Sequence, residues 1–372
     1  MRTTRSLAHA ALALTGLLAS ATPAAAEDWT VHTSPTAVDL TGATASPTQT
    51  AVVGRAGTML TSPDGVTWNP FASGTSADLF DIAYNASGYA ISGREVVLEW
   101  DGVGTPVPLV ATSDDETFTP VMPTVTSIWF GNPSFSGFGF SSIVRYDRTT
   151  GPAGGFVTQG PVLAMCPAPS GGVVYVTTRG DVAKYDDFFV QIVYHDQDDA
   201  SPLDLVAASF TGDCSSVVAS NRLNSTDFEV LELELSSSAQ AKQSTGWNSI
   251  AESLPPFLEI TNVFRISIFY VVHAVDLQTG ELRIFVGERG PGGLREEEVT
   301  PSAFASMLDH AVMLAPANPF DGADSSGESG PLVVTAVGTG GTIVGTTLTP
   351  PLFADGFESG DTTAWSVNVG LK

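Results

Sequence analysis

Residues 29–67, WTVHTSPTAVDLTGATASPTQTAVVGRAGTMLTSPDGVT, and residues 68–106, WNPFASGTSADLFDIAYNASGYAISGREVVLEWDGVGTP, are one unit written twice. They superimpose without a gap when the second is moved back by 39 positions. The matched residues are Trp29 with Trp68, Asp39-Leu40 with Asp78-Leu79, Ala51 with Ala90, and Gly54-Arg55 with Gly93-Arg94. A tandem period of about 40 residues, with short apolar runs and turn residues, is typical of a β-propeller.

The rest of the chain repeats this rhythm with divergent residues. Blades of four strands, a to d with a innermost, are typical of this fold. The first two units predict strands at 40–46, 50–56, 58–62 and 67–71, then at 79–85, 88–93, 95–100 and 105–111. Further units fall at 125–148, 162–195, 204–235, 257–288 and 310–348. The prediction is an all-β, single-domain propeller over residues 27–350 with seven blades, or six if the third or sixth unit is misread.

The two ends of this array predict how the ring closes. The seventh unit stops after its third strand, because Pro350-Pro351 follows. Residues 28–33 resemble an outer strand that has no blade of its own. We therefore expect residues 28–33 to pair with residues 341–348, which covers an edge that would otherwise invite aggregation.

Residues 1–26 have the pattern of a secretory signal peptide, with a basic start, an apolar stretch and Ala24-Ala25-Ala26 before the cleavage point. Its removal takes two arginines, so the mature chain has 13 basic and 40 acidic residues and a net charge of −27. This balance excludes nucleic-acid binding, which needs Lys and Arg. The longest later apolar run, residues 266–275, is too short for a membrane span. The expectation is a secreted or periplasmic monomer.

The chain has two cysteines, Cys166 and Cys214. An oxidising compartment favours a disulfide between them, and a pair of buried thiols is the alternative.

The local motif Ser62-Pro-Asp64-Gly65-Val-Thr-Trp68 predicts a tight hairpin turn with Trp68 packed behind it. It resembles the Asp box of BNR-type propellers, one residue shorter. Together with VGRAGTML (53–60) and AVGTGGTIVG (336–345), it is similar to the repeats of photosystem II assembly-factor-like propellers. The resemblance implies a propeller, but these residues are structural and indicate no ligand.

Arginines supply the candidate binding residues. Arg55, Arg94, Arg179 and Arg222 all fall at the end of strand b, so they are expected around one mouth of the ring, where they could bind a carboxylate or sulfate. The alternative is pairing with acidic loop residues on the same face. These are Asp114, Asp115, Glu116, Asp196, Asp198 and Asp199.

The sequence also contains residues that could bind a metal ion and a motif that resembles one of an enzyme family. The acidic loops at Asp196, Asp198 and Asp199 and at Asp321, Asp324 and Glu328 could hold calcium, although neither matches an EF-hand loop; no other cofactor is expected. Phe264-Arg265-Ile266-Ser267 resembles the F-R-I-P motif of sialidases but lies in the sixth unit, so Arg265 is expected to pair with an acid.

Residues 351–372 contain DGFESGD and resemble a C-terminal tag of exported bacterial proteins.

These observations favour a non-enzymatic scaffold that binds a protein or glycan partner at one mouth of the ring. The alternatives are a sialidase-like hydrolase or lyase acting on an acidic glycan, and a surface adhesin that depends on residues 351–372.

Overall fold

The computed structural model describes an all-β chain. The described residues are 30–112, 116–132, 141–168, 172–185, 190–194, 203–211, 214–224, 227–235, 247–251, 254–266, 269–279, 282–288, 294–297, 312–314 and 332–348. The expected signal peptide (1–26), the tail (351–372), Trp29 and the acidic loop with Asp196, Asp198 and Asp199 lie outside these ranges.

Six four-stranded antiparallel sheets each come from one continuous stretch of chain. The first two contain β2 (Leu40–Ala45), β3 (Thr50–Gly54), β4 (Met59–Ser62) and β5 (Asn69–Pro70), then β6 (Leu79–Asn85), β7 (Gly88–Gly93), β8 (Val96–Trp100) and β9 (Val107–Ala111). The third and fourth contain β10 (Val121–Pro123), β11 (Ser127–Asn132), β12 (Ser141–Asp147) and β13 (Gly151–Thr158), then β14 (Val162–Pro167), β15 (Val173–Thr177), β16 (Val182–Tyr185) and β17 (Val190–Tyr194). The fifth and sixth contain β18 (Leu205–Phe210), β19 (Ser216–Arg222), β20 (Phe228–Glu234) and β21 (Asn248–Ala251), then β22 (Leu258–Ile266), β23 (Phe269–Asp276), β24 (Leu282–Glu288) and β25 (Leu294–Glu297).

A further four-stranded sheet combines the two ends of the chain. Its strand order is β1-β28-β27-β26, formed by β1 (Thr30–His32), β26 (Val312–Leu314), β27 (Leu332–Val337) and β28 (Ile343–Leu348). Within it β1 runs antiparallel to β28, with Thr30 opposite Gly345 and His32 opposite Ile343. This is the pairing expected for residues 28–33, and we call this sheet the composite sheet.

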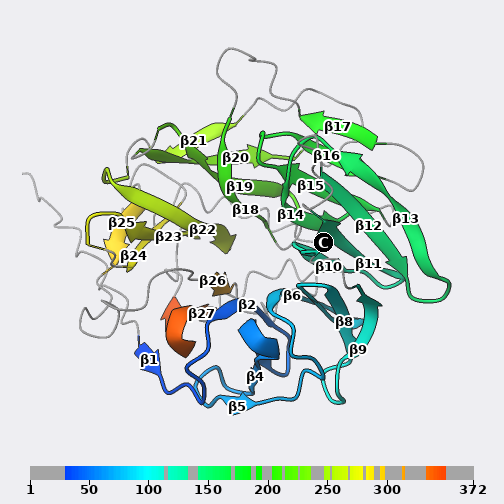
Figure 1. The fold of residues 1–372 in the computed structure, drawn as a ribbon. Helices are drawn as coiled ribbons and strands as arrows, with labels where there is room; N and C mark the ends of the chain where they lie inside the picture. Colours follow the sequence, from blue (N-terminus) through cyan, green and yellow to red (C-terminus); the bar gives the residue numbers. More distant parts are fainter. Residues whose placement is uncertain are drawn as a thin grey trace, which may run out of the picture.

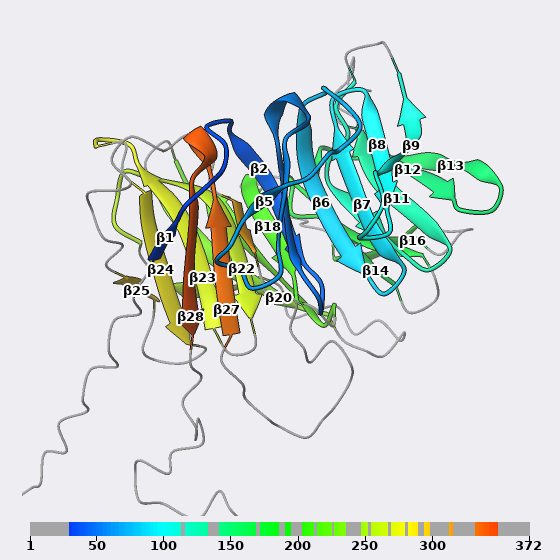
Figure 2. The ribbon, with the colours of Figure 1, turned by 90° about the horizontal axis from the view of Figure 1, so that it is seen from below.

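The sheets stand around a common centre, with β2, β6, β10, β14, β18 and β22 innermost (Figure 1). Figure 2 shows β1 lying along β28 at the side of the composite sheet. The molecule therefore has a β-propeller fold with four-stranded blades. In each meander the b–c turn and the connection into strand a lie at one end of the blade, and the a–b and c–d turns lie at the other.

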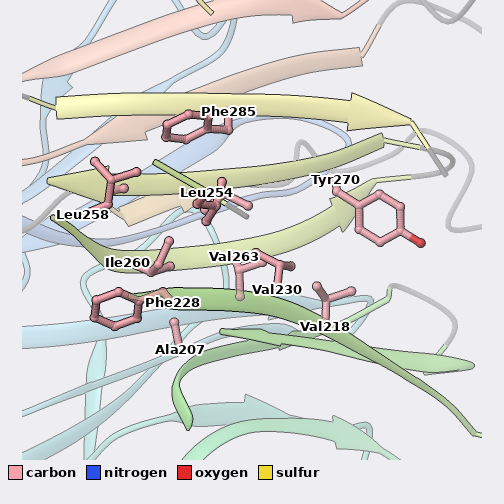
Figure 3. Close-up of a cluster of buried hydrophobic side chains, with 12 residues drawn as sticks. Ala207, Val218, Phe228, Val230, Leu254, Leu258, Ile260, Val263, Tyr270 and Phe285 are labelled. Atoms are coloured by element: carbon pink, nitrogen blue, oxygen red, sulfur yellow. The ribbon is translucent and has the colours of Figure 1, made fainter. Parts of the chain in front are cut away.

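The core lies between neighbouring sheets. Leu40 and Leu60 of the first blade pack in one buried cluster with Val337 and Ile343 of the composite sheet. A larger cluster joins the fifth and sixth blades, where Val230 lies beside Val263 (Figure 3). Strands between two such clusters are buried on both faces, and every residue of β7 and of β15, the second strands of their blades, is buried.

The strand predictions were accurate in the first two blades and for most strands of the later units, and four strands were missed. The eight strands of the first two blades begin and end within two residues of their predicted bounds. In the third unit β10 and β13 were not predicted, and β21 and β25 were also missed. Most of β13, GPAGGFVT, is exposed, so no buried face imposes an alternating pattern on its sequence.

The predicted disulfide between Cys166 and Cys214 is confirmed, with the Cα atoms 6.1 Å apart. It links β14 of the fourth blade to the turn between β18 and β19 of the fifth. The chain-entropy model gives such a loop of 48 residues about 4 kcal/mol of stabilisation. In the part of the chain that the structure describes, no helix has the length and apolarity needed to cross a membrane.

Candidate binding face

Three of the four candidate arginines occupy one repeated backbone position. The N–H of Arg55 donates to the carbonyl of Asp39 across 3.0 Å, and the N–H of Arg94 donates to Asp78 across 2.7 Å. The N–H of Arg222 makes the same bond to Asp204 across 2.9 Å. Each arginine follows or ends strand b, and each aspartate directly precedes strand a of the same blade. We call the end of the ring that carries these turns the b–c face.

Arg179 is displaced from this position by one residue. In the fourth blade the equivalent bond runs from the N–H of Thr178 to the carbonyl of Pro161, across 2.9 Å. Arg179 follows Thr178 in the b–c turn and is exposed. It therefore lies on the b–c face, but its backbone is held differently from the other three.

The arginine side chains pair with aspartates that precede the inner strands. Nε of Arg55 lies 3.4 Å from Oδ2 of Asp39, and its Nη1 lies 3.8 Å from Oδ2 of Asp78 in the next blade. Nη1 of Arg222 lies 3.6 Å from Oδ2 of Asp204. The side chains of Arg55 and Arg222 remain 46% and 42% exposed. Exposed pairs of this kind are worth about 0–1 kcal/mol each, so a ligand can displace them at low cost.

The partners of Arg55 and Arg222 are not among the six acids named from the sequence. Of those six acids, only Glu116 lies in the described part of the chain, and it accepts a hydrogen bond from Nδ2 of Asn132 across 3.3 Å. The actual partners Asp39 and Asp78 were overlooked, although both belong to the Asp-Leu pair that recurs in the doubled stretch. The available signal was a surface acid directly before the inner strand in the first, second and fifth blades.

The motif VG-x-x-G-T forms the b–c turn and fastens it to the next blade. In the first blade Ala56 adopts a left-handed conformation (φ 53°), and its N–H donates to Oδ1 of Asp78 across 2.9 Å. In the composite sheet Gly340 (φ 61°) donates to Oδ1 of Asp39 across 3.0 Å. The N–H of Leu40 also donates to the carbonyl of Gly338 across 3.0 Å. The composite sheet thus holds the first blade through the same type of contact that joins the first blade to the second.

At the opposite end of the ring, Asp64 organises the turn of the motif that ends in Trp68. Its Oδ1 accepts hydrogen bonds from the N–H groups of Thr67 (2.7 Å) and Val66 (2.9 Å) and from the hydroxyl of Ser62 (2.9 Å). These bonds, led by that from Thr67, hold the pKa of Asp64 well below its usual range. Gly65 has φ 72°, and Trp68 is buried against the composite sheet. The role of these residues is to shape the hairpin.

Arg265 pairs with an acid, as expected. Its Nη1 lies 2.6 Å from Oε1 of Glu232 in β20 of the neighbouring blade, and the hydroxyl of Tyr270 donates to Oε2 of Glu232 across 2.8 Å. Nη1 of Arg265 also donates to the hydroxyl of Ser216 across 3.2 Å. Both carboxylate oxygens of Glu232 therefore have partners, and the cluster connects the fifth and sixth blades.

The described residues contain no group of three or more His, Cys, Asp or Glu side chains arranged to hold a metal ion. The residues proposed for calcium from the sequence lie outside them.

Comparisons with known proteins reinforce the fold. No family model matches the chain, and no curated protein matches it. Among solved structures, YCF48 bound to D1 peptide matches with a TM-score of 0.56 and 13% identity over 86% of this chain and 97% of that one. A catalytically inactive variant of virginiamycin B lyase from Staphylococcus aureus with quinupristin matches with a TM-score of 0.55 and 7% identity over 86% of this chain and 100% of the other. At these identities the likeness shows the β-propeller fold and nothing finer.

Proposed function

We propose that this chain is a secreted or periplasmic, non-enzymatic scaffold that binds a protein or glycan partner at the b–c face. The observation that carries the proposal is the repeated placement of Arg55, Arg94 and Arg222 at one end of the ring, with exposed side chains. A planar guanidinium presents a rigid fork of donors to a carboxylate or sulfate. The solved structure of YCF48 with a D1 peptide supports a binding role, since that protein has a similar fold and holds a peptide.

A single mouth requires a closed ring, and we propose that the composite sheet serves as the seventh blade. Three contacts support this: the bond from Gly340 to Asp39, the bond from Leu40 to Gly338, and the buried cluster that joins Leu40 to Ile343. On its other side, β26 lies beside β22 of the sixth blade.

The alternative of a hydrolase or lyase acting on an acidic glycan has one supporting observation, the likeness to a lyase. A sialidase-like site needs a tyrosine, a glutamate and several arginines converging in the channel. Arg265, Glu232 and Tyr270 do converge, but they contact one another between two blades and engage one arginine. The adhesin alternative depends on residues 351–372.

The test is capture of partners from the host envelope and culture medium with mature protein, residues 27–372, as bait. Three baits are compared: the unmodified chain, the variant R55A/R94A/R222A, and the variant T48E/A86E/V103E. Both variants change the net charge by −3. The second places the change on exposed turns at the opposite end of the blades. We expect a partner that is retained by the unmodified chain and the opposite-end variant and is lost from the arginine variant.

Two further arms separate the alternatives. A chelator in the wash tests the calcium proposal, and a bait that ends at residue 350 tests the adhesin alternative. If a partner binds the arginine variant as well as it binds the unmodified chain, the b–c face is not its binding site.

A further inference from the structure

The sixth blade breaks the charged pattern of the b–c face. The N–H of Leu277 donates to the carbonyl of Phe257 across 2.7 Å. Phe257 directly precedes the inner strand β22, and Leu277 directly follows β23. This is the backbone bond that Arg55 makes with Asp39 and Arg222 with Asp204. Phe257 therefore takes the place of the aspartate, and Leu277 takes the place of the arginine.

Both replacements are exposed rather than buried. Phe257 is 41% exposed and Leu277 is 48% exposed. Leu223, which follows Arg222 in the b–c turn of the fifth blade, is 58% exposed. That turn leads into Phe228, which shares a buried cluster with Leu254 and Leu258 on either side of Phe257 (Figure 3). The three exposed side chains therefore belong to adjoining turns of one face, and we call them the apolar patch.

The backbone of Phe257 carries a second, independent signal. Its φ is 68°, in the left-handed region that a bulky side chain rarely adopts. An Asp or Asn is far better suited to that conformation. A strained backbone conformation persists only where the surrounding structure holds the residue in place, and such residues cluster at functional sites.

We propose that the apolar patch is the anchor point for the partner at the b–c face, and that it takes an apolar side chain of a peptide segment beside a carboxylate. The carboxylate is specified by Arg222, which adjoins Leu223. Its guanidinium lies over the ring of Phe228, 5.8 Å from the centroid, and forms an exposed pair with Asp204 at 3.6 Å, so an incoming carboxylate can compete for it. Arginine is among the residue types that contribute most of the binding energy near the centre of protein interfaces. This inference rests on the proposed function, since it names the chemistry of the same face.

The probe is a phage-displayed library of random heptapeptides, selected on unmodified mature protein. Enriched peptides are synthesised, and their affinities are measured by fluorescence anisotropy. The main variant, F257D/L277R, rebuilds the aspartate–arginine pair of the first and fifth blades. Because aspartate suits the left-handed conformation better than phenylalanine, this variant should fold and melt at or above the temperature of the unmodified chain. V103D, at an exposed valine on the opposite end, is the matched control.

The expected result is a set of peptides with an apolar residue next to Asp or Glu. Their binding should weaken by about tenfold or more in F257D/L277R, as for an anchor residue, and should be unchanged in V103D. If R222A loses binding and F257D/L277R retains it, the apolar patch is not the anchor, and the b–c face remains the binding surface. Equal binding to all variants would overturn both, and a selection that enriches no peptide on the unmodified protein would overturn the anchor.

Discussion

The backbone N–H of Gly340 donates a 3.0 Å hydrogen bond to Oδ1 of Asp39, although 301 residues separate them in the chain. The N–H of Ala56 makes the equivalent 2.9 Å bond to Asp78, 22 residues away. The first contact joins the composite sheet to the first blade, and the second joins the first blade to the second. The same local geometry therefore serves both the ordinary junction and the one between the two ends of the chain.

Replacing Asp39 or Asp78 with alanine should destabilise the protein by about 1–2 kcal/mol, because each loses a backbone donor together with its contact to Arg55. Asp204→Ala, which breaks the exposed pair with Arg222, should cost less than about 1 kcal/mol. Urea denaturation of the three variants measures the difference. Equal losses for all three would contradict a structural role for these interblade bonds.

The two glycines of the last b–c turn should respond differently to alanine. A Cβ on Gly341 would lie 2.0 Å from the carbonyl oxygen of Thr36, whereas one on Gly340 would have no neighbour within 4 Å. Gly340→Ala should therefore cost about 1–2 kcal/mol, for the left-handed backbone alone. Ala56 already occupies the matching position in the first blade. Gly341→Ala should cost several times more or prevent folding, and thermal denaturation of the pair compares the two effects.

Asp64 should contribute to stability above pH 4 and lose that contribution in acid. Its folded pKa is depressed by the hydrogen bonds from Thr67 and Val66, so its contribution is fully present above the unfolded pKa of about 3.8 and decreases as pH falls toward the folded value. Asp64→Asn keeps an acceptor but does not titrate. The stability gap between the unmodified chain and this variant should therefore narrow from pH 6 to pH 2.5, as followed by urea denaturation. A constant gap would contradict this assignment.

Glu232→Gln should cost about 3–5 kcal/mol, because it leaves Arg265 partly buried without its charged partner. The double variant E232L/R265M removes both charges and should be more stable than E232Q. Urea denaturation of the unmodified chain and these two variants tests this. If E232Q and E232L/R265M have equal stability, the pair between the fifth and sixth blades is unimportant.

How far the sequence predicts this fold depends on the length of a strand and on whether it faces the core. The inner strand β10 is buried at all three residues and was missed, because so short a strand shows no period. The doubled stretch placed the strands of the first two blades to within two residues, since both copies carry the same apolar and turn positions. The outer strands β13, β21 and β25 were missed. In β13 most side chains are exposed, and an exposed strand has no apolar alternation to detect.

The candidate face was predicted in outline and missed in detail. Arg55 and Arg94 were found because the two copies align without a gap, but the aspartates that hold them were not considered. The sequence alone could not show that Phe257 corresponds to Asp39, because the sixth blade no longer resembles the first in sequence. The two positions correspond through a backbone hydrogen bond, which depends on the register of the strands and not on residue type.

The b–c turns form one mouth only if the ring is closed by the chain's own ends, and removal of residues 27–33 tests this most directly. The deletion takes away β1, which pairs with β28 from Thr30 to His32. Hydrogen exchange would be followed at the amides of β28 and, for comparison, of β11 in the third blade. If β1 closes the ring, the deletion should lower the melting temperature markedly and make exchange faster in β28 than in β11. An unchanged melting temperature with full protection of β28 would contradict it.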